Sequence, residues 1–293
     1  MLHHQTVTQN GHAAMRGILA AGAARIAPSA ASERNAFKSI EIAGAALASR
    51  YEPSPRYSRH ALESSFRLSL KHLSAHAPLV LDIGAGTGVP GTILRTLIPA
   101  ARLIAVDRSD AMLQVCRETA DYDAHYCADA AALPFGDETV DLAIAVQALH
   151  LVPDKQATLI EISRTLKSTG LVLLATNTPA NLRRQLFHRV LPRFSAVDIP
   201  RHFDAREVAK WAAPAGLKLI DSAECEFSVE FPTSADFVTF AQSRPLFSQQ
   251  QMSDREFALD LEALCRVMAA DLREEAIRSD SALTAFLLVK EPA

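Results

Sequence analysis

The sequence is poor in the residues that mark several specialised protein classes. It has four cysteines and one tryptophan, and it has no run of about 20 apolar residues that would cross a bilayer. The cysteines, at positions 116, 127, 225 and 265, lack the paired spacing of a zinc site or a redox motif. The sequence therefore predicts no metal site, no disulfide framework and no membrane-spanning segment.

A strong charge of either sign is also missing. The formal net charge is -3 and the sequence pI ≈ 6.4. Proteins that hold nucleic acids normally carry a basic stripe on their surface, because they neutralise phosphates with lysine and arginine. We therefore expect a small-molecule partner rather than a nucleic acid, while the oligomeric state stays open.

The beginning of the chain has features of a targeting peptide. The stretch "MRGILAAGAARIAPSAA" (15–31) contains arginines, a short apolar run and small residues, but Arg25 interrupts the apolar run. We expect a cytoplasmic protein whose first residues form an arm or an alanine-rich helix.

Two amphipathic helices are predicted over 35–50 and 60–73, where apolar residues recur at helical spacing. The stretch between them contains two prolines and clustered Arg, Tyr and His residues, which indicates a loop. These elements and the N-terminal arm are expected to form a helical cap over residues 1–76, ahead of the main domain at 77–293.

The main domain alternates short apolar runs with helical patterns. Strands are predicted at 78–83, 101–107, 140–147 and 170–177, an order typical of a parallel sheet buried on both faces. Asp154 is expected to cap the helix before the last of these strands, and Gly170 is expected to end that helix.

The later part of the chain departs from this alternation. Strands are predicted within 217–231 and 281–292, and the segments 179–203 and 232–278 are expected to be helical insertions that cover the site. Asp204 with Glu207, and Ser253 with Glu256, have the spacing of capping boxes that open helices.

The stretch "VLDIGAGTG" (80–88) is the clearest motif of the sequence. It runs from a strand into Gly84, Gly86 and Gly88 and then into a helix, the place where open α/β sheets bind ligands. A dinucleotide site would need its third glycine at position 89, where this sequence has Val89. The spacing is instead D-x-G-x-G-x-G.

With Asp82 before the glycines and Asp107 at the end of the next strand, this motif resembles motif I of the class I S-adenosylmethionine (SAM)-dependent methyltransferases. The stretches 128–152 and 161–177 are similar to later blocks of the same family. The resemblance implies an α/β Rossmann-like fold, with a mostly parallel seven-stranded sheet, an antiparallel last strand and SAM as cofactor.

The resemblance also implies roles for single residues. Asp107 would accept hydrogen bonds from the ribose hydroxyls, while Asp129 and Ala130 would lie near the adenine. The alternative for Asp107 is capping of the following helix, a role that Asp110 could fill instead. An ordinary loop acid is the alternative for Asp129. The remaining residues of the expected cofactor site are Asp82, Gly84, Gly86, Gly88, Arg108 and Gln147.

Asp82 is the carboxylate nearest the turn and suits the cationic sulfonium and amino groups of SAM. Arg108 would lie beside the adenine, or else be a solvated surface residue.

The catalytic residues are less clearly marked. His150, just after the fourth predicted strand, could deprotonate an acceptor, although packing within the loop is the favoured interpretation. Tyr57, with Tyr51, could lie over the cofactor or pack against the domain. In the first insertion, Arg201 and His202, together with His188, are expected on a solvated face, with binding of an acidic substrate group as the alternative.

These residues predict a SAM-dependent methyltransferase that acts on a small metabolite or natural product by in-line methyl transfer in an enclosed site. One alternative is a non-methyl reaction of SAM, such as attack on its amino acid chain with release of methylthioadenosine. The second alternative is a subunit that binds SAM without turnover.

Overall fold

The computed structural model describes residues 58–244, 246–270 and 276–291, which divide into two compact units. We call them the sheet unit (58–181, 201–227 and 282–291) and the helical unit (Leu182–Pro200 and Ser228–Ser281). The predicted helix at 35–50 and both Tyr51 and Tyr57 lie outside the described residues. The predicted division into 1–76 and 77–293, with insertions that cover the site, stays a prediction.

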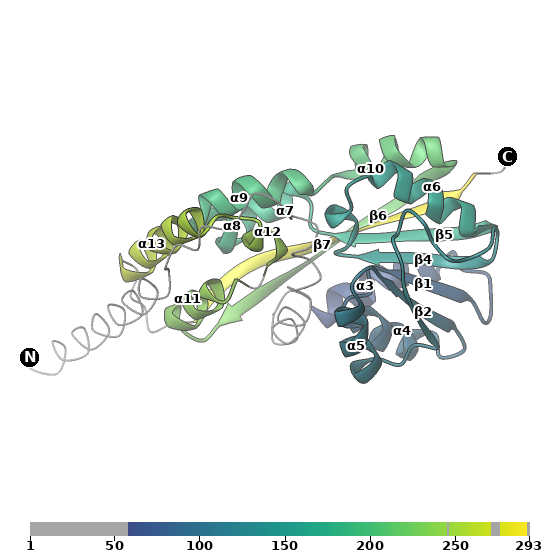
Figure 1. The fold of residues 1–293 in the computed structure, drawn as a ribbon, viewed down its shortest axis with the longest axis horizontal. Coiled ribbons are helices and arrows are strands. Elements are labelled where there is room, and N and C mark those ends of the chain that lie inside the picture. The colour runs from purple at the N-terminus through teal and green to yellow at the C-terminus, as the bar shows by residue number, and fades with distance from the viewer. Residues whose placement is uncertain (1–57, 245, 271–275, 292–293) are drawn as a thin grey trace, which may run out of the picture. The chain divides into compact units, whose positions relative to one another are not determined.

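Seven strands form one sheet in the order β3-β2-β1-β4-β5-β7-β6 (Figure 1). The strands are β1 (Leu79–Ile83), β2 (Arg102–Asp107), β3 (Ala124–Cys127), β4 (Val140–Val146), β5 (Leu166–Thr176), β6 (Leu217–Phe231) and β7 (Ile277–Lys290). Strands β1 to β5 pair in parallel, and β7 pairs antiparallel to β5. The predicted fold class is therefore confirmed.

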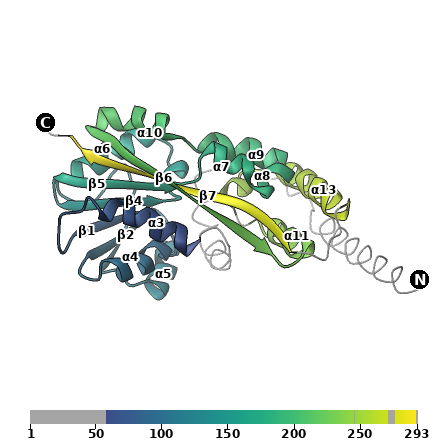
Figure 2. The same cartoon turned by 180° about the vertical axis from the view of Figure 1, so that it is seen from behind.

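Helices cover both faces of this sheet, as the apolar strands require. One core lies under α3 (Arg59–Leu70), α4 (Val89–Leu97) and α5 (Asp110–Thr119), and the other lies under α6 (Lys155–Thr165) and α10 (Ala205–Ala212). Figure 2 shows the sheet from the opposite side, with α3, α4 and α5 together on one face. All seven residues of β4 are buried, as expected for a central parallel strand.

Several helix ends follow the sequence signals. The side chain of Asp154 accepts a hydrogen bond from the N–H of Ala157 at the start of α6, as predicted. Asp204 and Glu207 form the predicted capping box of α10. Pro90 lies in the first turn of α4, where the absence of its N–H costs no helical hydrogen bond.

The prediction that Gly170 ends α6 is wrong. The helix ends at Thr165, and β5 begins at Leu166, so Gly170 lies inside the strand. The N–H groups of Glu138 and Thr139 donate to the carbonyls of residues 164 and 165, which ends the helix without a glycine. A Cβ at Gly170 would crowd the carbonyl of residue 167, so packing requires this glycine.

Strand β3 was not among the predicted strands. It has four residues at the edge of the sheet, and two of them are exposed. Because this edge strand is short and half-exposed, its sequence contains no apolar run that would predict a strand. It is a strand because it pairs with β2.

The helical unit contains a compact apolar cluster with several phenylalanines. Its helices are α8 (Leu186–Val190), α9 (Pro192–Asp198), α11 (Ser234–Gln242), α12 (Phe247–Gln250) and α13 (Asp254–Ala270). Ser253 and Glu256 exchange the predicted capping-box hydrogen bonds at the start of α13. The buried carboxylate of Asp260 accepts from the N–H of Phe194 at 2.8 Å and so joins α13 to α9.

Short helical segments complete the connections: η1 (Leu149–Leu151), α7 (Pro179–Arg184), η2 (Ile199–Arg201) and η3 (Ala213–Ala215). Within the described residues, no helix has the length and apolar character needed to span a membrane.

A glycine in α4 provides a test of the packing under the sheet. A Cβ at Gly91 would overlap the ring of Tyr122, which is buried against this helix. We expect Gly91→Ala to reduce the free energy of unfolding by about 1–3 kcal/mol, because the ring must move and the better helix propensity of alanine does not offset the overlap. Urea denaturation measures the change.

Gly136→Ala is the matched control, since the nearest atom to its added Cβ is an ordinary 3.6 Å away. Equal stability of the two variants would contradict the packing of Tyr122 on α4.

Candidate functional site

The turn between β1 and α4 contains three glycines, and the structure requires glycine at each position for a different reason. Gly84, Gly86 and Gly88 have positive φ angles of 72°, 57° and 89°. A Cβ at Gly84 would overlap Ala148, and one at Gly88 would overlap Cys116. Gly86 has nothing within 4 Å of its Cβ position, so its backbone borders open space. The turn thus offers one bare backbone face to a ligand.

The carboxylate of Asp107 fastens this turn to the end of β2. One oxygen accepts from the N–H of Gly86 at 2.9 Å, and the other accepts from the N–H of Ser109 at 2.8 Å. A carboxylate offers about four acceptor positions, so each oxygen keeps one for a ligand hydroxyl. Burial raises the pKa of Asp107, and these backbone hydrogen bonds oppose that rise.

Neither Asp107 nor Asp110 caps the following helix. The hydroxyl of Ser109 accepts from the N–H of Met112 and is the N-cap of α5. The helix-cap alternative for Asp107 is therefore wrong, and its two oxygens are held by the turn and by the first residues after β2.

The loop after β3 lies against the same strand end. The N–H of Ala128 donates to the carbonyl of Asp107 at 3.1 Å, which brings the following residues beside it. Asp129 is exposed and accepts from the N–H of Ala131, while Ala130 is half-buried. Arg108 is exposed. The structure therefore gathers Asp107, Arg108, Asp129 and Ala130 at neighbouring strand ends.

Asp82 lies deeper than the sequence suggested. It is 1% exposed, and one of its oxygens accepts a hydrogen bond from the hydroxyl of Tyr122, while its Oδ1 atom has no partner among the described residues. Burial raises the pKa of Asp82 to about 7, although the Tyr122 hydrogen bond lowers it. Burial thus opposes the ionisation of this carboxyl. Its partner Tyr122 is a residue that the sequence did not single out.

Gln147 lies at the end of β4 with a positive φ of 49°, unusual for a residue with a side chain. Its backbone N–H donates to the carbonyl of Ala175. Both the nitrogen and the oxygen of its side-chain amide also form hydrogen bonds. The nitrogen donates to Asn177, and the oxygen accepts from Thr176. Gln147 therefore connects the ends of β4 and β5.

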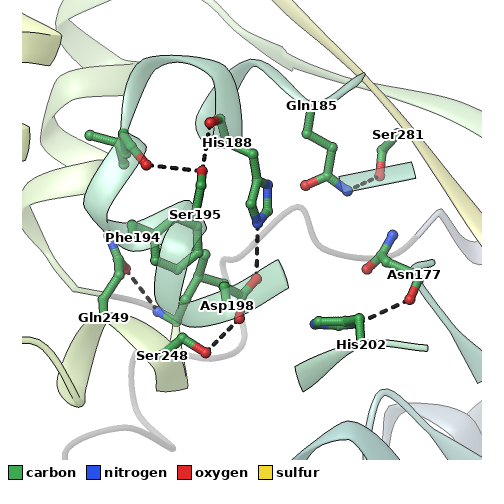
Figure 3. A network of polar contacts seen from close by, with 12 residues as sticks. Asn177, Gln185, His188, Phe194, Ser195, Asp198, His202, Ser248, Gln249 and Ser281 are labelled. Atoms are coloured by element: carbon green, nitrogen blue, oxygen red, sulfur yellow. Dashed lines mark hydrogen bonds and ion pairs between the residues drawn. The ribbon is translucent and has the colours of Figure 1, made fainter. Parts of the chain in front are cut away.

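His150 stacks on His202, with ring centroids 4.1 Å apart and 19° between the ring planes. The Nδ1 atom of His202 lies 3.0 Å from the carbonyl oxygen of Asn177 (Figure 3). A carbonyl only accepts, so Nδ1 of His202 carries the hydrogen. His150 therefore packs within the loop as the favoured interpretation expected, and its partner is His202, which lies 52 residues later in the sequence.

The expectation that His188 and His202 lie on a solvated face is wrong. Both are buried, and Arg201 is half-buried. In the helical unit, Nε2 of His188 lies 2.9 Å from Asp198, whose other oxygen accepts from the hydroxyl of Ser248 (Figure 3). Polar residues with such partners can be buried, and the sequence pattern does not show the partners.

No metal centre is evident in the part of the chain that the structure describes, where no group of three or more His, Cys, Asp or Glu side chains is arranged to hold an ion.

Comparison with known proteins bears on the same segment. Residues 81–174 match the family model described as a methyltransferase domain. The malonyl-[acyl-carrier protein] O-methyltransferase of Gallionella capsiferriformans is 31% identical over 132 residues, which are 41% of this chain and 46% of the relative. The trans-aconitate 2-methyltransferase of Variovorax paradoxus is 31% identical over 151 residues, 50% of this chain and 53% of the relative. The chain spans about half the length of these curated relatives.

Among solved structures, the [4+2]-cyclase SpnF superimposes with a TM-score of 0.53 and 19% identity, covering 91% of this chain and 98% of that one. At this identity the likeness shows a shared fold.

The buried carboxyl of Asp82 predicts a pH dependence of stability. Below about pH 4 the group is protonated in both states, and between about pH 4 and about pH 7 only the unfolded chain ionises it, so stability falls as the pH rises. The change from 3.8 to about 7 corresponds to roughly 4 kcal/mol. We expect Asp82→Asn to remove this component, measured by urea denaturation of the ligand-free protein at several pH values.

Asp221→Asn, on an exposed carboxylate of β6, is the control and should keep the wild-type slope. A slope in the Asp82 variant equal to that of the wild type would show that Asp82 ionises normally in the folded protein.

Proposed function

We propose that the chain is a class I SAM-dependent methyltransferase, which binds SAM at the turn after β1 and transfers the methyl group to a small acceptor. The observation that carries the proposal is the carboxylate of Asp107, anchored by two backbone N–H groups beside the unhindered Gly86. This pair offers a fixed acceptor for two ribose hydroxyls and room for the cofactor next to it.

The remaining cofactor contacts follow from the same strand ends. Asp129 and Ala130 would face the adenine, with Arg108 beside it. Asp82 would place its unpartnered Oδ1 toward the cationic amino acid part, because a nearby cation favours the ionised carboxyl. Gln147, held by β5, would close the other side of the turn. SAM has no phosphate group to bind. This fits a turn that has Val89 at the position where a dinucleotide-binding turn has its third glycine.

Bound SAM would supply an electrophilic methyl group on a sulfonium. The chain contributes mainly position, since an in-line attack needs an acceptor atom held close to that methyl and does not require a general base. His150 is stacked on His202, an arrangement that suits shaping the acceptor side more than removing a proton. Neither His150 nor Tyr57 is therefore needed as a base in this proposal.

The acceptor we propose is a small molecule with a carboxylate. The names of two relatives specify acids, a malonyl group and trans-aconitate. A carboxylate is already ionised at neutral pH, so it needs no base before attack. The net charge of -3 gives no support for a nucleic acid partner.

A different SAM reaction is the second candidate. The fold is shared with a [4+2]-cyclase, whose name specifies ring formation, so the fold by itself does not select methyl transfer over another reaction. A subunit that binds SAM without turnover is the remaining alternative.

The nucleoside product separates these three functions. We expect the protein to convert SAM to S-adenosylhomocysteine only when a carboxylic acid acceptor or a metabolite extract is present, measured by mass spectrometry. Methylthioadenosine formed from SAM alone would instead identify a reaction at the amino acid chain, and thermal stabilisation by SAM without any product would identify a binding subunit. If neither SAM nor S-adenosylhomocysteine binds, the proposed function is wrong.

The ribose role of Asp107 has its own test. Asp107→Ala removes a charged acceptor of two ribose hydrogen bonds, so the Kd for S-adenosylhomocysteine should rise at least about tenfold. Isothermal titration calorimetry measures this, and circular dichroism checks the fold. Asp221→Ala is the control and should bind like the wild type. Unchanged affinity in the Asp107 variant would remove this residue from the site.

A further inference from the structure

A group of uncharged polar side chains, most of them buried, lies where β4 and β5 end in the sheet unit. It combines hydroxyl, carboxamide and imidazole groups, and its members are Gln147, Thr176, Asn177, Thr178, Asn181, His202 and Thr284. All except Gln147 are buried. Buried polar groups are normally all hydrogen-bonded, so any atom left over indicates an interaction that the fold does not supply.

The carboxamide of Asn181, which is 1% exposed, has one such atom. Its oxygen accepts from the backbone N–H of Thr178 at 2.8 Å, from the hydroxyl of Thr178, and from the hydroxyl of Thr284 at 3.1 Å. Its nitrogen has no partner among the described residues. Turning the amide over would place the nitrogen against the N–H of Thr178, two donors facing each other, so the orientation is determined.

The oxygen of Asn181 has a structural role, and the nitrogen has none. With Thr178 it forms a reciprocal pair of hydrogen bonds at the start of α7, since the N–H of Asn181 donates to the hydroxyl of Thr178 at 3.2 Å. Aspartate would provide the same oxygen without leaving a buried donor unpaired. A buried N–H₂ group without a partner costs about 1–3 kcal/mol, so the folded chain alone does not account for the amide.

The polar group is continuous with the cofactor turn. Gly84 packs directly against Ala148, the residue after Gln147. Gln147 in turn hydrogen-bonds Thr176 and Asn177, and Asn177 donates to the carbonyl of Ala282 in β7, the strand that carries Thr284. Asn181 therefore belongs to a contact chain that begins at the glycine turn.

From this geometry we propose that the N–H₂ group of Asn181 binds an oxygen of the acceptor's carboxylate. The proposal rests on the proposed function and names the residue that recognises the acceptor. The polar group contains no Asp or Glu side chain, so none of its members repels a carboxylate by charge.

The reaction balances without a proton acceptor. A carboxylate oxygen forms the new bond to the methyl carbon while the bond from that carbon to sulfur breaks, and the electron pair stays on sulfur. The products are a neutral methyl ester and a neutral thioether. Asn181 holds one oxygen of the carboxylate by a hydrogen bond and so directs the other oxygen to the methyl group.

Asn181→Asp tests the assignment with a nearly isosteric change. The new side chain keeps an oxygen toward Thr178 and Thr284 but replaces the donor by an acceptor, which repels a carboxylate. The probes are trans-aconitate, its monoamide, and the malonyl thioester of N-acetylcysteamine, each titrated by calorimetry into the S-adenosylhomocysteine complex. We expect the Kd for trans-aconitate and for the malonyl thioester to rise at least about tenfold, and the Kd for the monoamide to rise less.

Gln156→Glu makes the same amide-to-acid change at an exposed position of α6 and should leave all affinities unchanged. The Kd for S-adenosylhomocysteine should stay at its wild-type value in both variants, which shows that the fold and the cofactor site are intact. Failure of the wild type to bind S-adenosylhomocysteine would refute the proposed function itself.

Two results would overturn the role of Asn181 alone. One is a wild-type complex that binds S-adenosylhomocysteine but none of the carboxylate probes. The other is an Asn181→Asp variant that binds these probes as the wild type does, in which case the amide nitrogen is satisfied by water. Asn181→Ser, which removes the donor without adding a charge, should give a smaller loss of carboxylate affinity than Asn181→Asp.

Discussion

The candidate site depends on the hydrogen bonds that the carboxylate of Asp107 accepts from Gly86 and Ser109. They fix the glycine turn after β1 against the end of β2, and they keep a charged group at a depth where burial opposes its ionisation. A rigid acceptor beside a bare backbone is suited to a neutral, hydroxyl-rich ligand such as a ribose. The loops after β3 and β4 belong to the candidate site because they lie at the same edge of the sheet as this turn.

Under the turn, the pair of Asp82 and Tyr122 shows how packing changes the ionisation of a residue in the sequence motif. The sequence motif presents Asp82 as a carboxylate beside the glycines. In the folded chain it is a buried group with a pKa of about 7, fixed by a tyrosine that occupies the space left by Gly91. Its charge therefore depends on pH and on any cation brought near it, so the binding of a cationic ligand beside Asp82, as we propose for SAM, would be linked to its ionisation.

Two of the histidines that the sequence singled out meet where β4 and β5 end. His150 and His202 come from segments 52 residues apart and stack because β4, β5 and the segment before α10 converge. Spacing along the chain does not signal such a contact, and a solvated face was the favoured interpretation for both His188 and His202. Their burial depends on partners from other segments: Asp198 for His188, and the backbone of Asn177 for His202.

The sequence by itself determined the alternation of strands and helices, the glycine turn and the acid at the end of β2, because apolar periodicity and glycine spacing are local and strong signals. It also located both capping boxes, which join residues three positions apart. The edge strand β3, the end of α6, the protonation of Asp82 and the unpartnered amide of Asn181 were decided only by the tertiary structure. Each of these depends on a neighbour distant in the chain, and burial next to that neighbour sets its geometry and its charge.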